Sequence, residues 1–309
     1  MDVLIALGGN AILQKNEKGT YGEQRRNIRE TARHIARIIR KGHRVVITHG
    51  NGPQVGDILL RNEMAKDKIP PMPLHVCGGE SQGMIGFMLV QELSNVLADI
   101  GIRKDAVCIL TRTLVNPKDP HFKNPSKQIG PFYEKSEATV IARKNNWTMV
   151  KEDGKYRRIV PSPIPIDILE FESIRGLRDK GKIVICTGGG GVPVIKKGKR
   201  YTGVDAVIDK DIASSMLAKK LKVDMLLILT NVEGVFADYG KKNQRILKNI
   251  SVKECGKYLE GGQFERGTME PKVRAAMEFV KTTGKTAVIT SLENVDLAIN
   301  GKAGTVISK

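Results

Sequence analysis

Two short glycine-centred turns stand where the backbone can bind an anion: Gly8-Gly9-Asn10 and Gly50-Asn51-Gly52. Each follows an apolar, β-branched run and leads into a segment with a helical pattern. A strand, a glycine turn and a helix start leave backbone N–H groups pointing toward a bound anion. Taken singly, such a turn could equally be an ordinary strand-to-helix loop that needs glycine for its geometry. A third row, Gly188-Gly189-Gly190-Gly191, makes a phosphate site the better interpretation.

None of the three turns is a standard nucleotide fingerprint. The segment from Gly50 to Gly56 misses the dinucleotide-binding pattern by one residue, and no suitably placed acidic residue follows it. The P-loop pattern is missing too, because Gly284-Lys285-Thr286 lacks the upstream glycine. We therefore expect the glycine loops to supply backbone amides and separate lysines to supply positive charge.

Three lysines stand apart from the general surface population. Lys127 lies between two prolines, Lys210 lies between Asp209 and Asp211 where a helix is predicted, and Lys272 follows a proline at the start of another predicted helix. Taken singly, each lysine is most simply a solvated surface charge, and either aspartate is most simply a helix N-cap. A lysine at a helix N-terminus is nevertheless electrostatically unfavourable. Two such lysines indicate that an anion lies between them.

Phosphoryl transfer is the chemistry that fits this set of residues. Its transition state spreads negative charge over several oxygens, so catalysis is mainly positioning and cationic stabilisation. A lysine about 4 Å from an oxyanion contributes on the order of 4 kcal/mol at an effective dielectric constant near 20, before desolvation. Asp211 can orient the lysines and reduce their mutual repulsion. The five histidines form no obvious base system, which suits a nucleophile that is already an anion.

The elements that must position these residues alternate along the chain between strand and helix. Helical patterns separate the strands, and Thr20 with Glu23 forms a possible capping box before one of them. Several strands are apolar on both faces, which is typical of a buried parallel sheet. We predict an α/β protein, a three-layer αβα sandwich with a mostly parallel central sheet. The predicted strands are residues 3–7, 44–48, 106–111, 183–187, 225–230, 286–290 and 305–307.

A proline-rich stretch at about 115–165 breaks this alternation. It is too long for a plain connection, so we expect an inserted lobe with a helix near Ser136–Lys144 and a hairpin turning at Asp153-Gly154. The alternative is a flexible surface insertion without function. Because Lys127 lies within it, we expect a lid over the site.

The composition limits the partners of the protein. The 309 residues carry a formal charge of +18, but the basic blocks are short and only one tryptophan is present. Single-strand binding surfaces need interleaved aromatic residues, so we expect no nucleic-acid partner. No run approaches the roughly twenty apolar residues of a membrane span. The four cysteines lack metal-ligand spacing and are interpreted as residues of a reduced compartment, so we expect a cytoplasmic protein with no membrane partner.

Seven segments together resemble the carbamate kinases, a branch of the amino acid kinase family, over essentially the whole chain. The lobe segment is the most specific of them, because other amino acid kinases lack it. The segments are ALGGNA (6–11), THGNGPQVG (48–56), KQIGPFY (127–133), RRIVPSP (157–163), GGGGVPV (188–194), VIDKDIAS (207–214) and PKVRAA (271–276).

The resemblance implies one amino acid kinase domain over residues 1–309 and reversible phosphoryl transfer between ATP and carbamate. It implies that Lys127 contacts the transferred group, that Lys210 and Lys272 bind the nucleotide phosphates, and that Asp211 organises the lysines. Magnesium would bridge the phosphates, with ATP or ADP as the nucleotide, and the protein would be a homodimer. The implied binding residues are Gly8, Gly9 and Asn10 for the phosphoryl group, Gly50, Asn51 and Gly52 for the carbamoyl end, and Gly188, Gly189, Gly190, Asn231 and Val232 for the nucleotide.

Two positions depart from the wider pattern. Related amino acid kinases carry a lysine where this chain has Ala6, and the family pattern has glycine where this chain has Glu270. A carboxylate beside Lys272 could pull that lysine away from the nucleotide, or it could simply point outward. Two alternative functions stay open: a family member that phosphorylates another small acid or phosphate, and a basic binding protein without catalysis.

Overall fold

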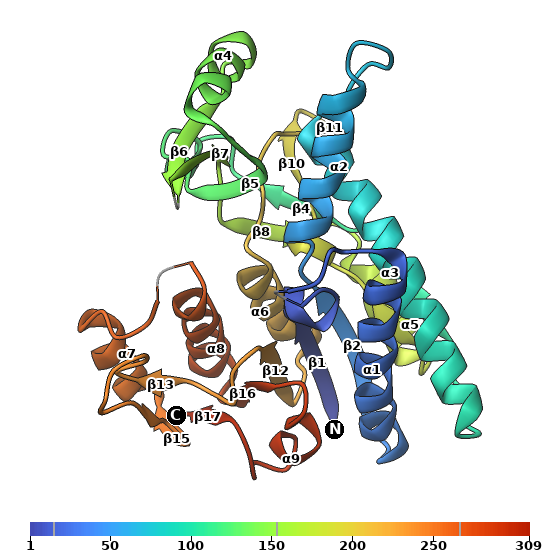
Figure 1. Cartoon of the computed structure of the whole chain (residues 1–309). Helices are drawn as coiled ribbons and strands as arrows, with labels where there is room; N and C mark the ends of the chain where they lie inside the picture. The colour runs from blue at the N-terminus through green and yellow to red at the C-terminus, as the bar shows by residue number, and fades with distance from the viewer. Residues whose placement is uncertain (15, 153, 266) are drawn as a thin grey trace.

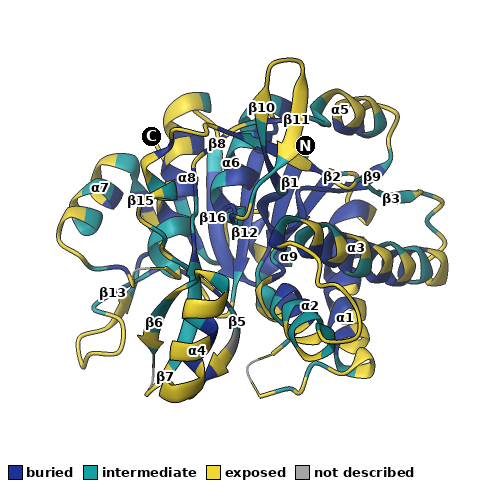
Figure 2. Cartoon of the chain, turned by 90° about the horizontal axis from the view of Figure 1, so that it is seen from above, coloured by how far each residue is buried: buried dark blue, intermediate teal, exposed yellow. Residues whose placement is uncertain are grey.

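A computed structural model describes residues 1–14, 16–152, 154–265 and 267–309. The predicted sandwich with a mostly parallel sheet is confirmed. In the described residues, eight strands pair in the order β15-β17-β16-β12-β1-β2-β9-β3, and β16 and β17 form the antiparallel pair. Figure 2 shows the buried strands at the centre of the molecule. The bounds are β1 (Asp2–Leu7), β2 (Arg44–His49), β3 (Ala106–Cys108), β9 (Ile183–Ile185), β12 (Met225–Thr230), β15 (Asn249–Ser251), β16 (Thr286–Ser291) and β17 (Thr305–Ser308).

Alternating side chains of the central strands bury against helices on opposite faces of the sheet. On β1, Val3, Ile5 and Leu7 join one core, and Leu4 and Ala6 join the other. The first core is covered by α1 (Tyr21–Arg40), α3 (Leu74–Asp99) and α9 (Val295–Ala298). The second is covered by α5 (Phe171–Asp179), α6 (Lys210–Leu221), α7 (Val252–Glu260) and α8 (Met269–Thr283).

The helix starts follow their local sequence. The predicted capping box is confirmed: the Thr20 hydroxyl accepts from the Glu23 N–H, and the Glu23 carboxylate accepts from the Thr20 N–H at 2.8 Å. The glycine turn after β2 leads directly into α2 (Gly52–Ala65), and short 3₁₀ helices occupy Gly9–Ala11, Pro120–Phe122 and Gly188–Gly190. The strand predicted at 183–187 ends early, because Thr187 takes the left-handed conformation with φ 53°.

A second sheet lies beside the first, and the sequence did not predict it. In the described part of the chain it has four strands in the order β11-β10-β4-β8. This second sheet also shortens the strand predicted at 106–111, because the chain leaves the main sheet after Cys108 and enters β4. The bounds are β4 (Arg112–Val115), β8 (Pro165–Ile168), β10 (Val192–Lys197) and β11 (Arg200–Gly203), with a small hairpin of β13 (Phe236–Ala237) and β14 (Arg245–Ile246) elsewhere.

The proline-rich stretch forms a lobe that stands off the main sheet (Figure 1). It comprises β5 (Lys127–Tyr133), α4 (Lys135–Asn145), β6 (Thr148–Glu152) and β7 (Lys155–Val160), so the predicted helix is confirmed. Strands β6 and β7 pair up to Glu152 and Lys155, which confirms the hairpin, while its predicted turn residue Asp153 lies outside the described residues. The antiparallel pair of β4 and β8 brackets the lobe.

The lobe is seated on α2 through an apolar contact. Ile129 of β5 and Val160 of β7 bury against Val55 and Ile58 of α2 and against Leu74 of α3. This contact sets the height of the lobe above the carboxyl ends of the central strands. Among the residues that the structure describes, no helix has the length and apolar character needed to cross a membrane.

Candidate active site

Four loops meet at the carboxyl edge of the central sheet, where α/β proteins bind ligands. Strands β12, β1, β2 and β9 are neighbours and run parallel. Their carboxyl ends lead to Asn231, Gly8, Gly50 and Gly188 respectively. The sheet therefore brings together loops that are up to about 220 residues apart in sequence.

The turns after β1 and β2 touch each other. The Gly50 N–H donates to the Leu7 carbonyl at 3.0 Å, and a Cβ on Gly50 would lie 3.6 Å from the Gly9 nitrogen. A Cβ on Gly8 would lie 2.8 Å from the Leu229 carbonyl oxygen of β12, so packing alone requires glycine at position 8. No atom lies within 4 Å of a Cβ built on Gly9 or Gly52, among the residues described. These two turns leave room for a ligand at the backbone.

The glycine row at 188–190 packs against the turn after β2. A Cβ on Gly188 would lie 2.5 Å from His49 Nε2, and one on Gly189 would lie 2.2 Å from Asn51 Nδ2. Three strand spacings separate β9 from β12, which puts this row about 14 Å from the loop of Asn231. The row thus lies beside the predicted carbamoyl loop and, through Gly190 and Ile208, beside the start of α6, and its predicted contact with the nucleotide stays a prediction.

Two buried polar side chains fix the shape of the turn after β2. Asn51 donates through Nδ2 to Ser81 Oγ of α3 at 2.7 Å. His49 donates through Nδ1 to the Gly50 carbonyl at 2.9 Å. The pKa of His49 is lowered to about 4, chiefly by burial and also by nearby Lys210, while the hydrogen bond to Gly50 opposes the shift. His49 is therefore a neutral hydrogen-bond donor at pH 7.

Asp211 joins the starts of α6 and α8. Its Oδ1 lies 2.8 Å from Lys210 Nζ, and its Oδ2 lies 3.2 Å from Lys272 Nζ. Lys272 also donates to the Thr268 carbonyl at 3.1 Å. Asp209 is the N-cap of α6, since its Oδ1 accepts from the Asp211 N–H at 2.9 Å. The structure thus brings together the two helix-start lysines and the acid between them.

The electrostatics of this cluster favour an anion. Burial raises the pKa of Asp211, but the two neighbouring ammonium groups outweigh burial and hold the pKa below its ordinary value. Burial lowers the pKa of Lys210, an effect that Lys272 reinforces and Asp211 opposes. Lys210 Nζ is buried and makes no aligned hydrogen bond to any described residue. Two cations facing one anion leave positive charge and hydrogen-bonding capacity for a ligand.

Lys127 reaches this cluster from the lobe. Its Nζ lies 2.7 Å from Asp209 Oδ2, across 82 residues of sequence. The four predicted catalytic residues, Lys127, Lys210, Asp211 and Lys272, are therefore gathered around the first turn of α6.

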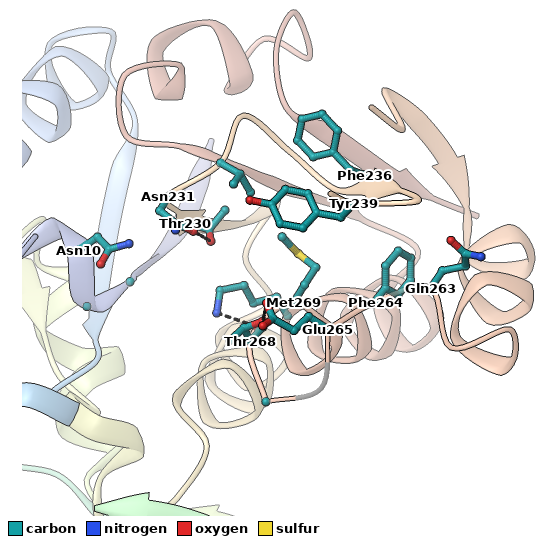
Figure 3. Close-up of a pocket in the computed structure, with 15 residues that line it drawn as sticks. Asn10, Thr230, Asn231, Phe236, Tyr239, Gln263, Phe264, Glu265, Thr268 and Met269 are labelled. Atoms are coloured by element: carbon teal, nitrogen blue, oxygen red, sulfur yellow. Dashed lines mark hydrogen bonds between the residues drawn. The ribbon is translucent and has the colours of Figure 1, made fainter. Parts of the chain in front are cut away.

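A pocket of about 320 Å³ opens beside the cluster. In Figure 3, Asn10, Thr230 and Asn231 lie at one end, and Phe236 and Phe264 lie at the other, with the Tyr239 ring between them. One end is thus polar and the other aromatic. The pocket is lined by Gly8, Gly9, Asn10, Thr230, Asn231, Val232, Phe236, Tyr239, Gln263, Phe264, Glu265, Gly267, Thr268, Met269 and Lys272.

Sequence reasoning missed the aromatic half of this pocket. Phe236 and Tyr239 have ring centroids 5.9 Å apart and come from the segment around β13, whereas Phe264 precedes α8. The available signal was a pair of aromatic residues three apart in a polar segment of an aromatic-poor chain.

Glu270, which stands where the family pattern has glycine, leaves Lys272 undisturbed, because Glu270 Oε1 accepts from Arg274 Nε at 2.8 Å.

Comparisons with known proteins agree with this geometry. A model of the amino acid kinase family matches residues 1–291. A carbamate kinase of Pyrococcus horikoshii is 48% identical over 309 residues, covering 99% of this chain and 98% of the relative. The solved carbamate kinase of Giardia lamblia bound to AMP-PNP is 47% identical, with a TM-score of 0.95 over 100% of this chain and 98% of that one. Another structure of the Giardia enzyme, thiocarbamoylated by disulfiram on a cysteine, is 46% identical with a TM-score of 0.92 over the same shares.

Proposed function

The chain belongs to the carbamate kinases of the amino acid kinase family, and we propose that it transfers a phosphoryl group reversibly between ATP and carbamate at the cluster around α6. The observation that carries this proposal is Asp211 held between Lys210 and Lys272 at the wall of the two-ended pocket. Structural ion pairs also shift pKa values, but they do not require an adjoining pocket with exposed glycine backbone.

The two ends of the pocket support separate binding of the adenine ring and of the phosphates of a nucleotide. Phe236, Tyr239 and Phe264 offer apolar surface of the kind on which an adenine ring stacks. Gly9 and Asn10, at the polar end, offer backbone amides, and Lys272 offers charge. We assign this pocket to ATP or ADP, with the adenine at the aromatic end and the phosphates toward Gly9.

In the ATP-forming direction, a β-phosphate oxygen of ADP attacks the phosphorus of carbamoyl phosphate. The new P–O bond forms as the bond from phosphorus to the carbamoyl oxygen breaks, and carbamate leaves to decompose into ammonia and CO₂. Lys210 and Lys272 stabilise the charge on the transferred group from the nucleotide side, and Lys127 stabilises it from the lobe. Asp211 keeps the two helix-start ammonium groups in place.

No general base is required, because both ADP and carbamate react as anions. The neutral His49 fits this scheme, since its Nδ1–H is used to hold the Gly50 carbonyl. The turn of Gly50, Asn51 and Gly52 is assigned to the carbamoyl end, where the adjacent glycine row at 188–190 supports it from behind.

Magnesium fits this site only when it is bound to the nucleotide. Both carboxylate oxygens of Asp211 face lysines, so Asp211 is occupied, and we assign the metal's ligands to phosphate oxygens and water. When bound, Mg²⁺ supplies charge neutralisation between the phosphates.

The lobe is proposed to act as a lid that carries Lys127. Closure of such an element excludes water and completes the constellation of charges. The apolar seat on α2 and the contact of Lys127 with Asp209 support a lobe that docks on the site. Limited proteolysis between Lys123 and Ile129 should slow when ADP and carbamoyl phosphate are both present. Equal cleavage with and without both ligands would count against the lid.

The function is tested by coupled measurement of ATP formed from ADP and carbamoyl phosphate, with and without Mg²⁺. We expect turnover by the wild-type protein and its loss in Asp211→Asn, which leaves the lysines without their shared counter-ion. Glu278→Gln, which removes the carboxylate of the α6–α8 ion pair with Lys219 away from the cluster, is the matched control and should retain activity. Turnover with an amino-acid carboxylate, and none with carbamoyl phosphate, would favour another family activity.

We further propose a homodimer that acts in the cytoplasm. Leu110, which follows the edge strand β3, is 59% exposed, and Phe87 of α3, next to Gly86 that packs on Cys108 of β3, is 60% exposed. Exposed apolar residues at a sheet edge favour association. The four cysteines are free thiols in the described residues, as in proteins of a reduced compartment. Sedimentation of the wild-type protein and of Phe87→Ser tests the dimer.

A further inference from the structure

The two carboxylate oxygens of Asp209 have different partners. Oδ1 accepts from the backbone N–H groups of Asp211 at 2.9 Å and of Ile212 at 3.3 Å, and thereby caps α6. Oδ2 accepts from Lys127 Nζ at 2.7 Å. One side chain therefore joins the start of the helix that carries Lys210 and Asp211 to the lysine that the lobe delivers.

The capping role alone does not account for this arrangement. Serine, asparagine and aspartate cap helices about equally well, so the backbone contacts do not need a full negative charge. The negative charge of Asp209 acts on Lys127, which the lobe brings toward Lys210 and Lys272. These three ammonium groups repel one another, and Asp211 faces only two of them. Asp209 provides the counter-ion for the third.

The contact is also sheltered enough to hold its geometry. The Asp209 side chain is 12% exposed, and Lys127 is 32% exposed. Asp209 is fixed by its hydrogen bonds to α6, so it loses little freedom when Lys127 binds. An ion pair with one partner already fixed is a better positioning device than a pair of two mobile surface chains.

We propose that Asp209 is a positioning residue for phosphoryl transfer, which holds the Lys127 ammonium at the start of α6 and so aligns the lobe with the reacting group. The proposal rests on the assignment of Lys127 to the transferred group in the proposed function. Asp209 does not touch the substrates; it acts through Lys127.

The test separates the charge of Asp209 from its capping role. Asp209→Asn and Asp209→Ser both keep a capping oxygen and remove the counter-ion. We expect kcat to fall on the order of tenfold to a hundredfold in both variants, as for other misplaced catalytic groups, while KM for ADP stays within about twofold of the wild-type value. Thermal midpoints should stay within about 2 °C of wild type. Ser251→Ala, which removes the capping hydroxyl of α7, is the matched control and should lower stability with kcat unchanged.

A double-mutant cycle distinguishes positioning from a general structural effect. If Asp209 acts through Lys127, then Lys127→Ala combined with Asp209→Asn should be no slower than Lys127→Ala alone. Losses in kcat that multiply between the two sites would overturn the proposal.

Amine labelling supplies a readout that does not depend on activity. Acetic anhydride should modify Lys127 severalfold faster in Asp209→Asn than in the wild-type protein without substrates, with Lys135 of the same lobe as internal reference. Unchanged labelling together with wild-type kcat in both Asp209 variants would refute the positioning role. A wild-type protein that forms no ATP from carbamoyl phosphate would refute the proposed function instead, and the labelling result would still report on the contact.

Discussion

The side-chain amide of Asn51 lies directly against the α-carbon of Gly189. A Cβ built on Gly189 would come within 2.2 Å of Asn51 Nδ2, and Gly189 has φ +61°. Asn51 cannot move aside freely, because Nδ2 donates to Ser81 Oγ at 2.7 Å. The glycine row after β9 therefore sets the position of the turn after β2, to which we assign the carbamoyl end of the substrate.

We predict that Gly189→Ala destabilises the protein and distorts this turn. An alanine in the left-handed conformation costs about 1–2 kcal/mol, and overpacking adds about 1–3 kcal/mol. KM for carbamoyl phosphate should rise as Asn51 is displaced. Gly198→Ala is the matched control, since Gly198 has φ +59° and no described atom within 4 Å of its Cβ position. Urea unfolding compares the two variants; equal free energies of unfolding would contradict the steric argument.

The central sheet was predictable because its signal is local. Strand β12 was predicted with the bounds that the structure gives it, 225–230, and every described residue from Met225 to Leu229 is buried. A run that is apolar on both faces has few other places in a globular protein. The second sheet carries no such signal. Its strands are short and partly exposed, β8 starts at Pro165, and Arg112 pairs with Val192 across 80 residues.

The charged half of the site was predictable for a different reason. A lysine in the first turn of a helix is unfavourable, so the sequence alone indicates that Lys210 and Lys272 face an anion. The aromatic half of the pocket breaks no local rule, and Phe236 and Phe264 meet only in the folded chain. The sequence of the glycine row at 188–190 leaves its role open. Sequence can indicate that a side chain does not fit, but not whether a ligand or a neighbouring side chain fills the space.

We predict that His49 weakens the fold in mild acid. Its pKa is about 4 in the folded state against an ordinary 6.5. Between these values the unfolded chain binds a proton that the folded chain does not, so stability falls as the pH drops from about 6.5 toward 4, by on the order of 2 kcal/mol. His49→Asn, whose Nδ2 can still donate to the Gly50 carbonyl, should flatten this part of the profile. Urea unfolding at pH 7 and pH 4.5 checks it; parallel profiles for the two proteins would exclude His49 as the cause.

We predict that disulfiram, the reagent that modified a cysteine of the Giardia enzyme, leaves this protein active. The thiolate is the nucleophile, and burial raises the pKa of Cys77 and Cys108 to about 11 and of Cys186 and Cys255 to about 12. None of the described residues that line the pocket is a cysteine.

Intact-mass measurement and ATP formation after incubation with the reagent check this expectation. Gln263→Cys puts a thiol in the pocket wall and should gain one adduct and lose activity. Inhibition of the wild-type protein at the same reagent concentration would show that a buried thiol becomes accessible.

The last prediction concerns the separate roles of the three lysines in ADP binding and in phosphoryl transfer. Lys127→Ala should lose most of its kcat while ADP affinity stays near normal, because Lys127 comes from the lobe and not from the pocket wall. Lys272→Ala should weaken ADP binding as well, because Lys272 lines the pocket. Lys210→Ala should chiefly lower kcat, since charge beside the bond in transfer matters most as it breaks. Each loss should be on the order of 2–4 kcal/mol. Lys127→Arg should not restore the kcat that Lys127→Ala loses, because a planar guanidinium cannot replace a compact ammonium beside Asp209. Steady-state kinetics and ADP titration separate the three, and wild-type turnover by Lys127→Ala would remove the lobe from the catalytic machinery.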